Sequence, residues 1–307
     1  MRHDIHPDGS RGAPAGHVTR RTFAGLTAGL AAGVAGYALA ARPVAASAVT
    51  TPGDGLVTAD FEVTAGDGAS LPGYLARPEG PGPFPMVHVV HEIFGVHDYI
   101  RDVCRRLAHE GYLAATANLY ARAGDTSTLS SYEDIFPIVA TATPSQVNAD
   151  LDAIGAFLAA EAGGDAARTG VTGFCWGGAA TWLYAAHNPA LRAGVAWYGR
   201  LAAPAERDGR PWPVDVANDL RVPVLGLYGG RDTLIPQADV DRMRAALAAA
   251  PDAPETEIIV YGDAGHGFHA DYRQGYDAAA AADGWARLLA WFRTHGLGQA
   301  RAPRKSP

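Results

Sequence analysis

Lysine is almost missing from this sequence, since Lys305 is the only one among 307 residues. A Schiff-base lysine or the lysine of a phosphate-binding P-loop is therefore excluded from the body of the chain. Cysteine is nearly as scarce, and the two present, Cys104 and Cys175, are too few for a disulfide framework or a cysteine-based zinc site.

Positive charge is also in deficit, with 25 basic residues against 32 acidic ones and a net charge of −7. That sign argues against nucleic acid as a partner, because phosphate binding needs clustered arginine and lysine. The hydrophobic fraction of 48% is ordinary for a globular protein and excludes disorder for most of the chain. The length suits one or two domains, and α/β folds often use 250 residues as one.

The first 48 residues differ from the rest. Arg20 and Arg21 precede an uncharged stretch, residues 24–41, and Ala46-Ser47-Ala48 forms a small-x-small cleavage pattern. This pattern is similar to a twin-arginine export signal. We therefore predict a signal peptide at 1–48, export by the twin-arginine machinery to the periplasm or the medium, and only transient membrane contact. An uncleaved N-terminal anchor is the alternative, although the glycine-rich and alanine-rich stretch makes a weak membrane span.

The remaining chain is expected to form one domain over residues 49–298, followed by an unstructured polar tail at 299–307. Short apolar runs alternate regularly with amphipathic stretches, which predicts a mostly parallel sheet with helices on both faces. The expected strands are 71–77, 85–90, 112–117, 169–174, 193–198, 222–228 and 257–261, and the expected helices are 99–110, 144–161, 176–187, 237–249 and 276–295.

Residues 173–178, Gly-Phe-Cys-Trp-Gly-Gly, lie between a predicted strand and a predicted helix. They match the G-x-S-x-G nucleophile elbow with cysteine in place of serine. Glycines suit such a turn because the strand and the helix must approach closely. Cys175 would then lie at a helix N-terminus, which favours a thiolate, and the Trp176 N–H could bind an oxyanion. A buried structural cysteine in a glycine-rich turn is the alternative.

Asp232 and His266 each follow a later predicted strand. The order nucleophile, acid, histidine is that of α/β-hydrolases. His266 would take the proton of the thiol, while Asp232 would orient the imidazole and stabilise its cation. Either residue alone would be an ordinary surface group, but the three together at strand ends predict a catalytic site.

The sequence resembles the dienelactone hydrolase family from about Pro72 to Phe292. Beside residues 173–178, the motifs that carry the resemblance are His-Glu-Ile-Phe-Gly at 91–95, Asn-Leu-Tyr-Ala-Arg at 118–122, Arg-Asp at 231–232 and Gly-His-Gly-Phe at 265–268. The resemblance implies an α/β-hydrolase fold. It also implies the roles of nucleophile for Cys175, acid for Asp232, base for His266, thiol-holding glutamate for Glu92, second oxyanion N–H for Ile93, and contacts to a substrate carboxylate for Tyr120 and Arg122.

One position departs from the family. Members that act on dienelactone carry an arginine four residues after the histidine, where this chain has Ala270. Arg273 could replace that arginine. A carboxylate such as Glu92, placed after a buried strand, is costly unless it has a function or a salt bridge, and Arg122 is the candidate partner for such a bridge.

The implied activity is cysteine-dependent hydrolysis of a small, anionic lactone or carboxylic ester (carboxymethylenebutenolidase, EC 3.1.1 class), without a cofactor. Two alternatives stay open: an esterase or thioesterase on other acyl substrates, and a catalytically silent cell-surface binding module. No metal site is expected, because His88, His91, His97 and His269 show no metal-ligand spacing. Cys104 is expected in the core, and a Cys104–Cys175 disulfide would abolish the nucleophile.

Overall fold

The computed structural model describes residues 50–203 and 209–298, so the predicted signal peptide at 1–48 and the predicted tail at 299–307 lie outside the described residues. Within them, eight strands form one sheet in the order β1-β2-β4-β3-β5-β6-β7-β8. The strands are β1 Leu56–Thr64, β2 Ser70–Pro78, β3 Phe84–Val90, β4 Leu113–Ala117, β5 Gly164–Phe174, β6 Leu191–Trp197, β7 Val224–Gly229 and β8 Thr256–Tyr261.

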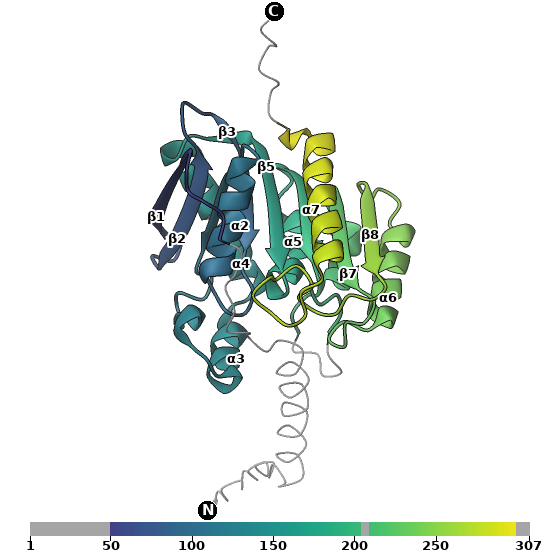
Figure 1. Ribbon diagram of the computed structural model, residues 1–307. Coiled ribbons are helices and arrows are strands. Elements are labelled where there is room, and N and C mark those ends of the chain that lie inside the picture. The colour runs from purple at the N-terminus through teal and green to yellow at the C-terminus, as the bar shows by residue number, and fades with distance from the viewer. Residues whose placement is uncertain (1–49, 204–208, 299–307) are drawn as a thin grey trace, which may run out of the picture.

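Only the β1–β2 and β2–β4 pairs are antiparallel, and the other five pairs are parallel. Helices cover both faces, with α2 and α7 in front of the sheet in Figure 1 and α4 and α5 behind it. The helices are α2 Asp98–His109, α3 Tyr132–Thr141, α4 Pro144–Glu161, α5 Trp176–His187, α6 Gln237–Ala249 and α7 Ala278–Phe292, with short turns η1 Thr126–Thr128, η2 Pro213–Asp219 and η3 Arg293–Leu297. The predicted fold class, a mostly parallel α/β sheet of the α/β-hydrolase type, is confirmed.

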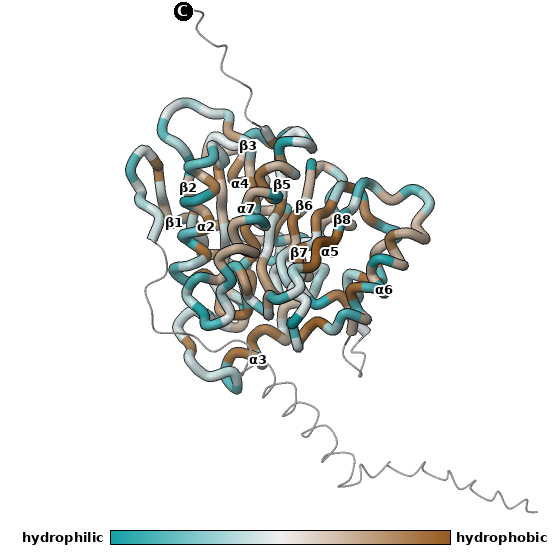
Figure 2. The backbone as a smooth tube through the Cα atoms, turned by 45° about the vertical axis from the view of Figure 1, so that its right-hand side comes forward, coloured by the Kyte–Doolittle hydropathy of each residue, from teal (hydrophilic) through white to brown (hydrophobic). Residues whose placement is uncertain are grey.

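The core lies along the central strands. Every residue of β4 and β7 is buried, and β3 and β6 each leave one residue less than buried. Figure 2 shows hydrophobic residues following these strands and α5, while hydrophilic residues occupy the outer loops. This arrangement leaves the loops at the strand ends free to carry polar groups, which is where α/β proteins place their sites.

Two elements were not predicted. Strand β1 pairs along its whole length with β2 at the sheet edge, and its alternating Val57, Ala59, Phe61 and Val63 carried a signal that could have found it. Helix α3 begins after Ser131, whose side chain accepts a hydrogen bond from the Glu133 N–H at 3.2 Å. None of the helices in the described ranges combines the length and apolar character that a membrane span requires.

Cys104 lies in the core, as predicted. It belongs to the buried stripe of α2 with Ile100, Val103 and Leu107, and its side chain is 0% exposed. Burial strongly raises the pKa of its thiol, so the group stays protonated and unreactive. Both cysteines are free, and the disulfide considered from the sequence is not formed in this structure.

Candidate active site

Cys175 occupies a strained turn between β5 and α5. Its backbone has φ 56° and ψ −115°, a conformation that L-residues rarely adopt. Two glycines permit the turn. A Cβ at Gly173 would lie 2.2 Å from the Gly177 carbonyl oxygen, and one at Gly177 would lie 2.3 Å from the Val90 oxygen. The strain fixes the thiol at the start of α5, beyond the end of the central strand.

The thiol faces the predicted base and acid. Cys175 Sγ lies 3.2 Å from His266 Nε2, and His266 Nδ1 lies 2.8 Å from Asp232 Oδ2. All three residues are at least 94% buried. Asp232 Oδ1 accepts hydrogen bonds from the N–H groups of Leu234 and Ile235, so the carboxylate is held in one orientation.

Burial alone would lower the pKa of His266. Cys175 and Asp232 outweigh that effect and raise the pKa to about 10. The surroundings therefore stabilise the imidazolium that forms when the thiol transfers its proton. Tyr198, itself at a positive φ of 37°, packs edge-on against the imidazole at 5.3 Å and supports its orientation.

His91 orients the loop that carries the expected second oxyanion donor. Its Nε2 accepts from the Leu119 N–H at 3.2 Å, so this nitrogen is unprotonated and Nδ1 carries the proton. Nδ1 then donates to the Glu92 carbonyl oxygen at 2.7 Å. That carbonyl belongs to the same peptide unit as the Ile93 N–H, and the bond fixes the plane of this peptide.

The two loops expected to supply oxyanion donors also touch each other. The His91 ring stacks on the Trp176 ring with centroids 5.5 Å apart and planes 15° from parallel. Burial lowers the pKa of His91 to about 4, and its bond to the Glu92 carbonyl only partly opposes this. The imidazole is therefore neutral at physiological pH, as both of its hydrogen bonds require.

Glu92 is completely buried, and three side chains surround its carboxylate. Its Oε2 accepts from the Tyr272 hydroxyl at 2.6 Å and lies 3.2 Å from Arg273 Nη2 and 3.3 Å from His97 Nε2. Burial alone would raise the pKa of Glu92, but Arg273, His97 and Tyr272 lower it to about 2. The carboxylate is thus ionised throughout the physiological range.

The cation beside Glu92 is Arg273, not the Arg122 suggested from the sequence. Arg122 instead pairs with Asp150 at 2.7 Å and Asp67 at 2.6 Å. The structure does not bring its guanidinium to Glu92. Through these two carboxylates, Arg122 links α4 to the loop after β1.

Tyr120 lies beside the site as a buried aromatic group. Its ring centroid is 4.8 Å from the rings of both His91 and Trp176, and only 1% of the residue is exposed. Burial raises the pKa of its hydroxyl well above the ordinary value, so the phenol stays neutral. Tyr120 therefore packs between the two loops that are expected to supply the oxyanion donors.

Ala270 and Arg273 belong to one turn that lies beside Glu92. Ala270 is fully buried, and the Arg273 N–H donates to its carbonyl at 3.0 Å, closing a turn. This turn brings the Arg273 guanidinium over Phe94 at 4.6 Å and into contact with Glu92. The contacts of His97 and Tyr272 with Glu92 were missed from the sequence, and Tyr272 lies 180 positions from Glu92, where no local pattern joins the two.

The described residues hold no cluster of three or more histidine, cysteine or acidic side chains arranged for a metal ion. The histidines considered from the sequence have separate surroundings and separate contacts. His88 is buried in β3 against Tyr184, His91 orients a peptide, and His269 packs beneath α7.

The sheet order, the helices on both faces and the strained strand–helix turn define the class, an α/β-hydrolase. The chain belongs to the dienelactone hydrolase family, whose sequence profile matches residues 71–296. It is therefore an enzyme, a hydrolase acting on lactones or esters.

Individual relatives agree with this assignment. A Methylorubrum extorquens protein, provisionally assigned as a carboxymethylenebutenolidase, is 52% identical over 264 residues, which span 85% of this chain and 90% of the relative. A Bradyrhizobium protein, provisionally assigned as a 2-oxo-3-(5-oxofuran-2-ylidene)propanoate lactonase, is 33% identical over 76% of this chain and 93% of its own length. A crystal structure from Klebsiella pneumoniae, provisionally assigned as a dienelactone hydrolase, matches with a TM-score of 0.74 and 50% identity over 78% of this chain and 98% of that one.

Proposed function

We propose that this protein is a cysteine-dependent hydrolase of lactones or esters that carry a carboxylate near the reacting carbonyl. Cys175 is the nucleophile, His266 the general base and Asp232 the acid that orients it. The observation that carries the proposal is the buried relay from Sγ to Nε2 at 3.2 Å and from Nδ1 to the Asp232 carboxylate at 2.8 Å. Nucleophile, base and orienting group within hydrogen-bond reach are the general arrangement of covalent catalysis.

The proposed reaction has two halves. Cys175 and His266 share one proton, and with that proton on His266 Nε2 the thiolate sulfur attacks the substrate carbonyl. The N–H groups of Trp176 and Ile93 stabilise the resulting oxyanion. The carbon–oxygen bond then breaks, and His266 protonates the leaving alkoxide or enolate, which leaves a thioester on Cys175. His266 next takes a proton from water, the hydroxide attacks the thioester, and the carboxylic acid product departs as the thiol is restored.

Arg273 is the group that would recognise the carboxylate of the substrate. It is almost completely buried, always charged, and held against Glu92 with Tyr272 on the same oxygen. A substrate carboxylate would compete with Glu92 for this guanidinium, in a planar geometry suited to a two-point ion pair. The lactone named for the Bradyrhizobium relative is itself a carboxylate, which supports an anionic substrate.

The test is a comparison of hydrolysis rates for a γ-lactone bearing a conjugated carboxylate, its methyl ester, and a short acyl nitrophenyl ester. The proposal expects a preference for the anionic lactone and loss of all activity in Cys175→Ala. A preference for neutral esters with Cys175 still required would favour the esterase alternative. Full activity without Cys175 would remove the cysteine mechanism, and activity on none of the three substrates would favour a binding module.

Export is part of the same proposal and rests on Arg20, Arg21 and the Ala46-Ser47-Ala48 pattern. The mature protein would then begin at or near Val49, two residues before Thr51, whose N–H is bonded to Asp102 of α2 at 2.5 Å. N-terminal sequencing of the exported protein tests this. Full-length protein found only in the cytosol, and unchanged when both arginines are replaced by lysine, would overturn it.

A further inference from the structure

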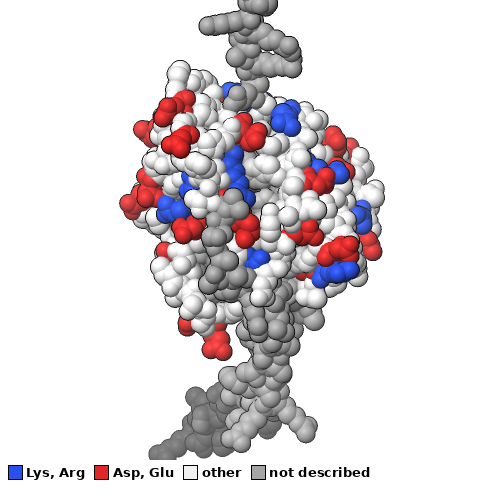
Figure 3. Space-filling view, viewed as in Figure 1, with Lys and Arg blue, Asp and Glu red and all other residues white. Residues whose placement is uncertain are grey.

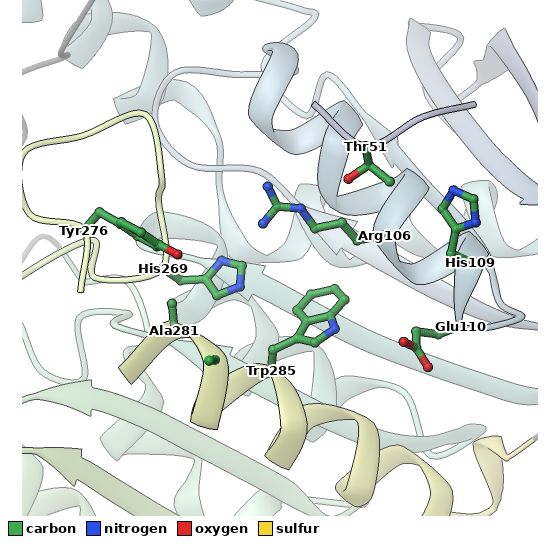
Figure 4. Close-up of a pocket in the computed structure, with 9 residues that line it drawn as sticks. Thr51, Arg106, His109, Glu110, His269, Tyr276, Ala281 and Trp285 are labelled. Carbon is green, nitrogen blue, oxygen red and sulfur yellow. The ribbon is translucent and has the colours of Figure 1, made fainter. Parts of the chain in front are cut away.

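A hollow of about 470 Å³ lies between α2 and α7, on the face of the sheet shown in Figure 1. Figure 4 shows side chains from both helices and from the preceding loop turned towards it. None of Cys175, Asp232, His266 and Glu92 lines it. Its volume falls within the range of small-molecule sites. We call it the α2–α7 pocket, and define it by Arg106, Glu110, His269, Tyr276 and Trp285.

His269 gives this pocket a polar group at its inner end. The residue is only 3% exposed, and its Nδ1 lies 2.5 Å from the Tyr99 hydroxyl. Burial holds the pKa of Tyr99 well above its ordinary value, so the phenol keeps its proton and can donate it to Nδ1. In that arrangement the hydrogen of the imidazole is on Nε2, which bonds to no residue in the described part of the chain. Figure 4 shows the nitrogen-bearing edge of the ring facing the pocket.

The walls favour a flat ring. Trp285 of α7 lies beside the His269 imidazole, with centroids 5.6 Å apart and planes 22° from parallel. Tyr276 stands at the rim and is 43% exposed, the highest exposure of a large hydrophobic side chain among the described residues. An exposed aromatic side chain and a half-buried tryptophan that line one pocket offer apolar surface suited to stacking.

The charges favour an uncharged occupant. Arg106 is already engaged by Asp102 at 2.6 Å and by Asp271, so its charge is balanced within the protein. Glu110 adds a negative charge to the lining. Burial, together with the nearby Arg106, lowers the pKa of His269 to about 3 and keeps the imidazole neutral. Acidic and basic side chains are interspersed over this face in Figure 3, with no broad field of one sign.

We propose that the α2–α7 pocket is a second binding site, for an uncharged planar aromatic molecule with an oxygen acceptor. The ring lies against Trp285 and Tyr276, and the oxygen accepts a hydrogen bond from His269 Nε2. The occupied site would contact the segment after β8 that also holds His266 and Arg273. The inference does not depend on the proposed function, because neither His269 nor Trp285 belongs to the catalytic relay.

Benzamide is a suitable probe, since it is flat, uncharged and carries a carbonyl oxygen. The chain has six tryptophans, and Trp285→Phe identifies the indole N–H signal of Trp285 in a ¹⁵N spectrum of the full-length protein. Benzamide should shift that signal with a Kd of about 1 mM, as expected for so small a ligand. The signal of Trp291, on the same helix but outside the lining, should not move.

Three comparisons make the test decisive. His269→Phe keeps a ring but removes the donor and should weaken benzamide about tenfold. Tyr276→Ala, at an exposed rim where folding is not at risk, should weaken it severalfold. The shift should persist in Cys175→Ala, whereas its loss there would place benzamide in the catalytic site.

No shift of Trp285 at about 20 mM benzamide would overturn the proposal. A shift that is unchanged in both His269→Phe and Tyr276→Ala would do the same. Benzoate has the same shape and carries a charge, and it should bind more weakly. Equal or tighter binding of benzoate would refute the uncharged class of ligand.

Discussion

Arg273 Nη2 lies 3.2 Å from Glu92 Oε2, and both side chains are almost completely withdrawn from water. A buried ion pair of this kind contributes little net stability, because desolvation offsets much of the attraction. The proposed importance of the pair is that a substrate carboxylate can take the place of Glu92 beside Arg273. Under the proposed function, an anionic substrate would exchange with Glu92 on the arginine, and the rate would then depend on the charge of the substrate.

We predict that Arg273→Gln slows the anionic lactone about ten- to a hundredfold in kcat/KM, and the neutral ester far less. The reason is that a charge-assisted pair is lost only with the anionic substrate. Arg122→Gln is the matched control, because its guanidinium is held by Asp67 and Asp150. Its ratio of anionic to neutral rates should stay near that of the wild type.

Steady-state kinetics on both substrates separate these outcomes. Removing Arg273 also leaves Glu92 buried without its cation, which threatens folding. The double variant Glu92→Gln with Arg273→Gln removes both charges and should fold better while keeping the selective loss. If Arg122→Gln shows the selective loss instead, the family role first expected of Arg122 would stand and Arg273 would be structural.

The second prediction concerns the two cysteines. Cys175→Ala should lower kcat by about 10⁴-fold or more, as removal of a nucleophile does in other enzymes with a similar relay. Cys104→Ala is the matched control. It removes a buried thiol from α2 and should lower the melting temperature by a few degrees while leaving kcat near the wild-type value.

Iodoacetamide gives an independent measurement for this prediction. Mass spectrometry should find the label on Cys175, with activity lost in proportion, because burial keeps Cys104 protonated and inaccessible. Complete labelling of Cys175 with activity retained would show that the thiol is accessible but not required.

His91 leads to a third prediction. Its Nδ1–H holds the carbonyl of the peptide unit whose N–H belongs to Ile93. His91→Ala should therefore misplace one oxyanion donor and lower kcat about ten- to a hundredfold with little change in KM. His91→Gln offers an amide donor at similar reach and should recover part of the loss.

A merely structural role for His91 would lower the melting temperature of both variants without separating kcat from KM. Parallel melting curves and kinetics of His91→Ala and His91→Gln distinguish the two roles. If kcat is higher in His91→Gln than in His91→Ala and the melting temperatures of the two variants do not follow the same pattern, the result supports orientation of the Ile93 peptide. Equal kcat in both variants contradicts it.

Much of this site could be anticipated from the sequence for a topological reason. Cys175, Asp232 and His266 each follow a strand of one parallel sheet, so their positions in the chain already place them at the same edge. The strained turn at Cys175 is likewise local, since Gly173 and Gly177 lie within two residues of it. Such features depend on local pattern and strand order, which a sequence displays.

The surroundings of Glu92 could not be anticipated in the same way. Whether Arg122 or Arg273 reaches this carboxylate depends on the turn closed at Ala270 and on the carboxylates available to Arg122. Asp67 and Asp150 lie 55 and 28 positions from Arg122, and nothing in the local pattern joins them. Long-range pairing of charges is decided by tertiary packing.

The last prediction concerns acid stability and rests on buried neutral histidines. Burial lowers the pKa of His88 and His91 to about 4 and that of His269 to about 3, from an ordinary value of 6.5. Between pH 6.5 and 4 these histidines bind protons in the unfolded chain but stay neutral in the folded protein. The free energy of unfolding therefore falls as the pH falls. The Glu92 carboxylate, with its pKa lowered to about 2, adds a further loss below pH 4.5.

His266 does not oppose this trend. Its pKa is raised to about 10, so its contribution is complete below pH 6.5 and is lost only as the pH rises towards 10. We therefore expect the melting temperature to drop by about 5 °C or more between pH 6.5 and 4.5. His88→Met isolates one source, because both ring nitrogens of His88 are buried without a partner among the described residues. The drop should be smaller in this variant than in the wild type, and identical curves would mean that His88 does not titrate on unfolding in this range.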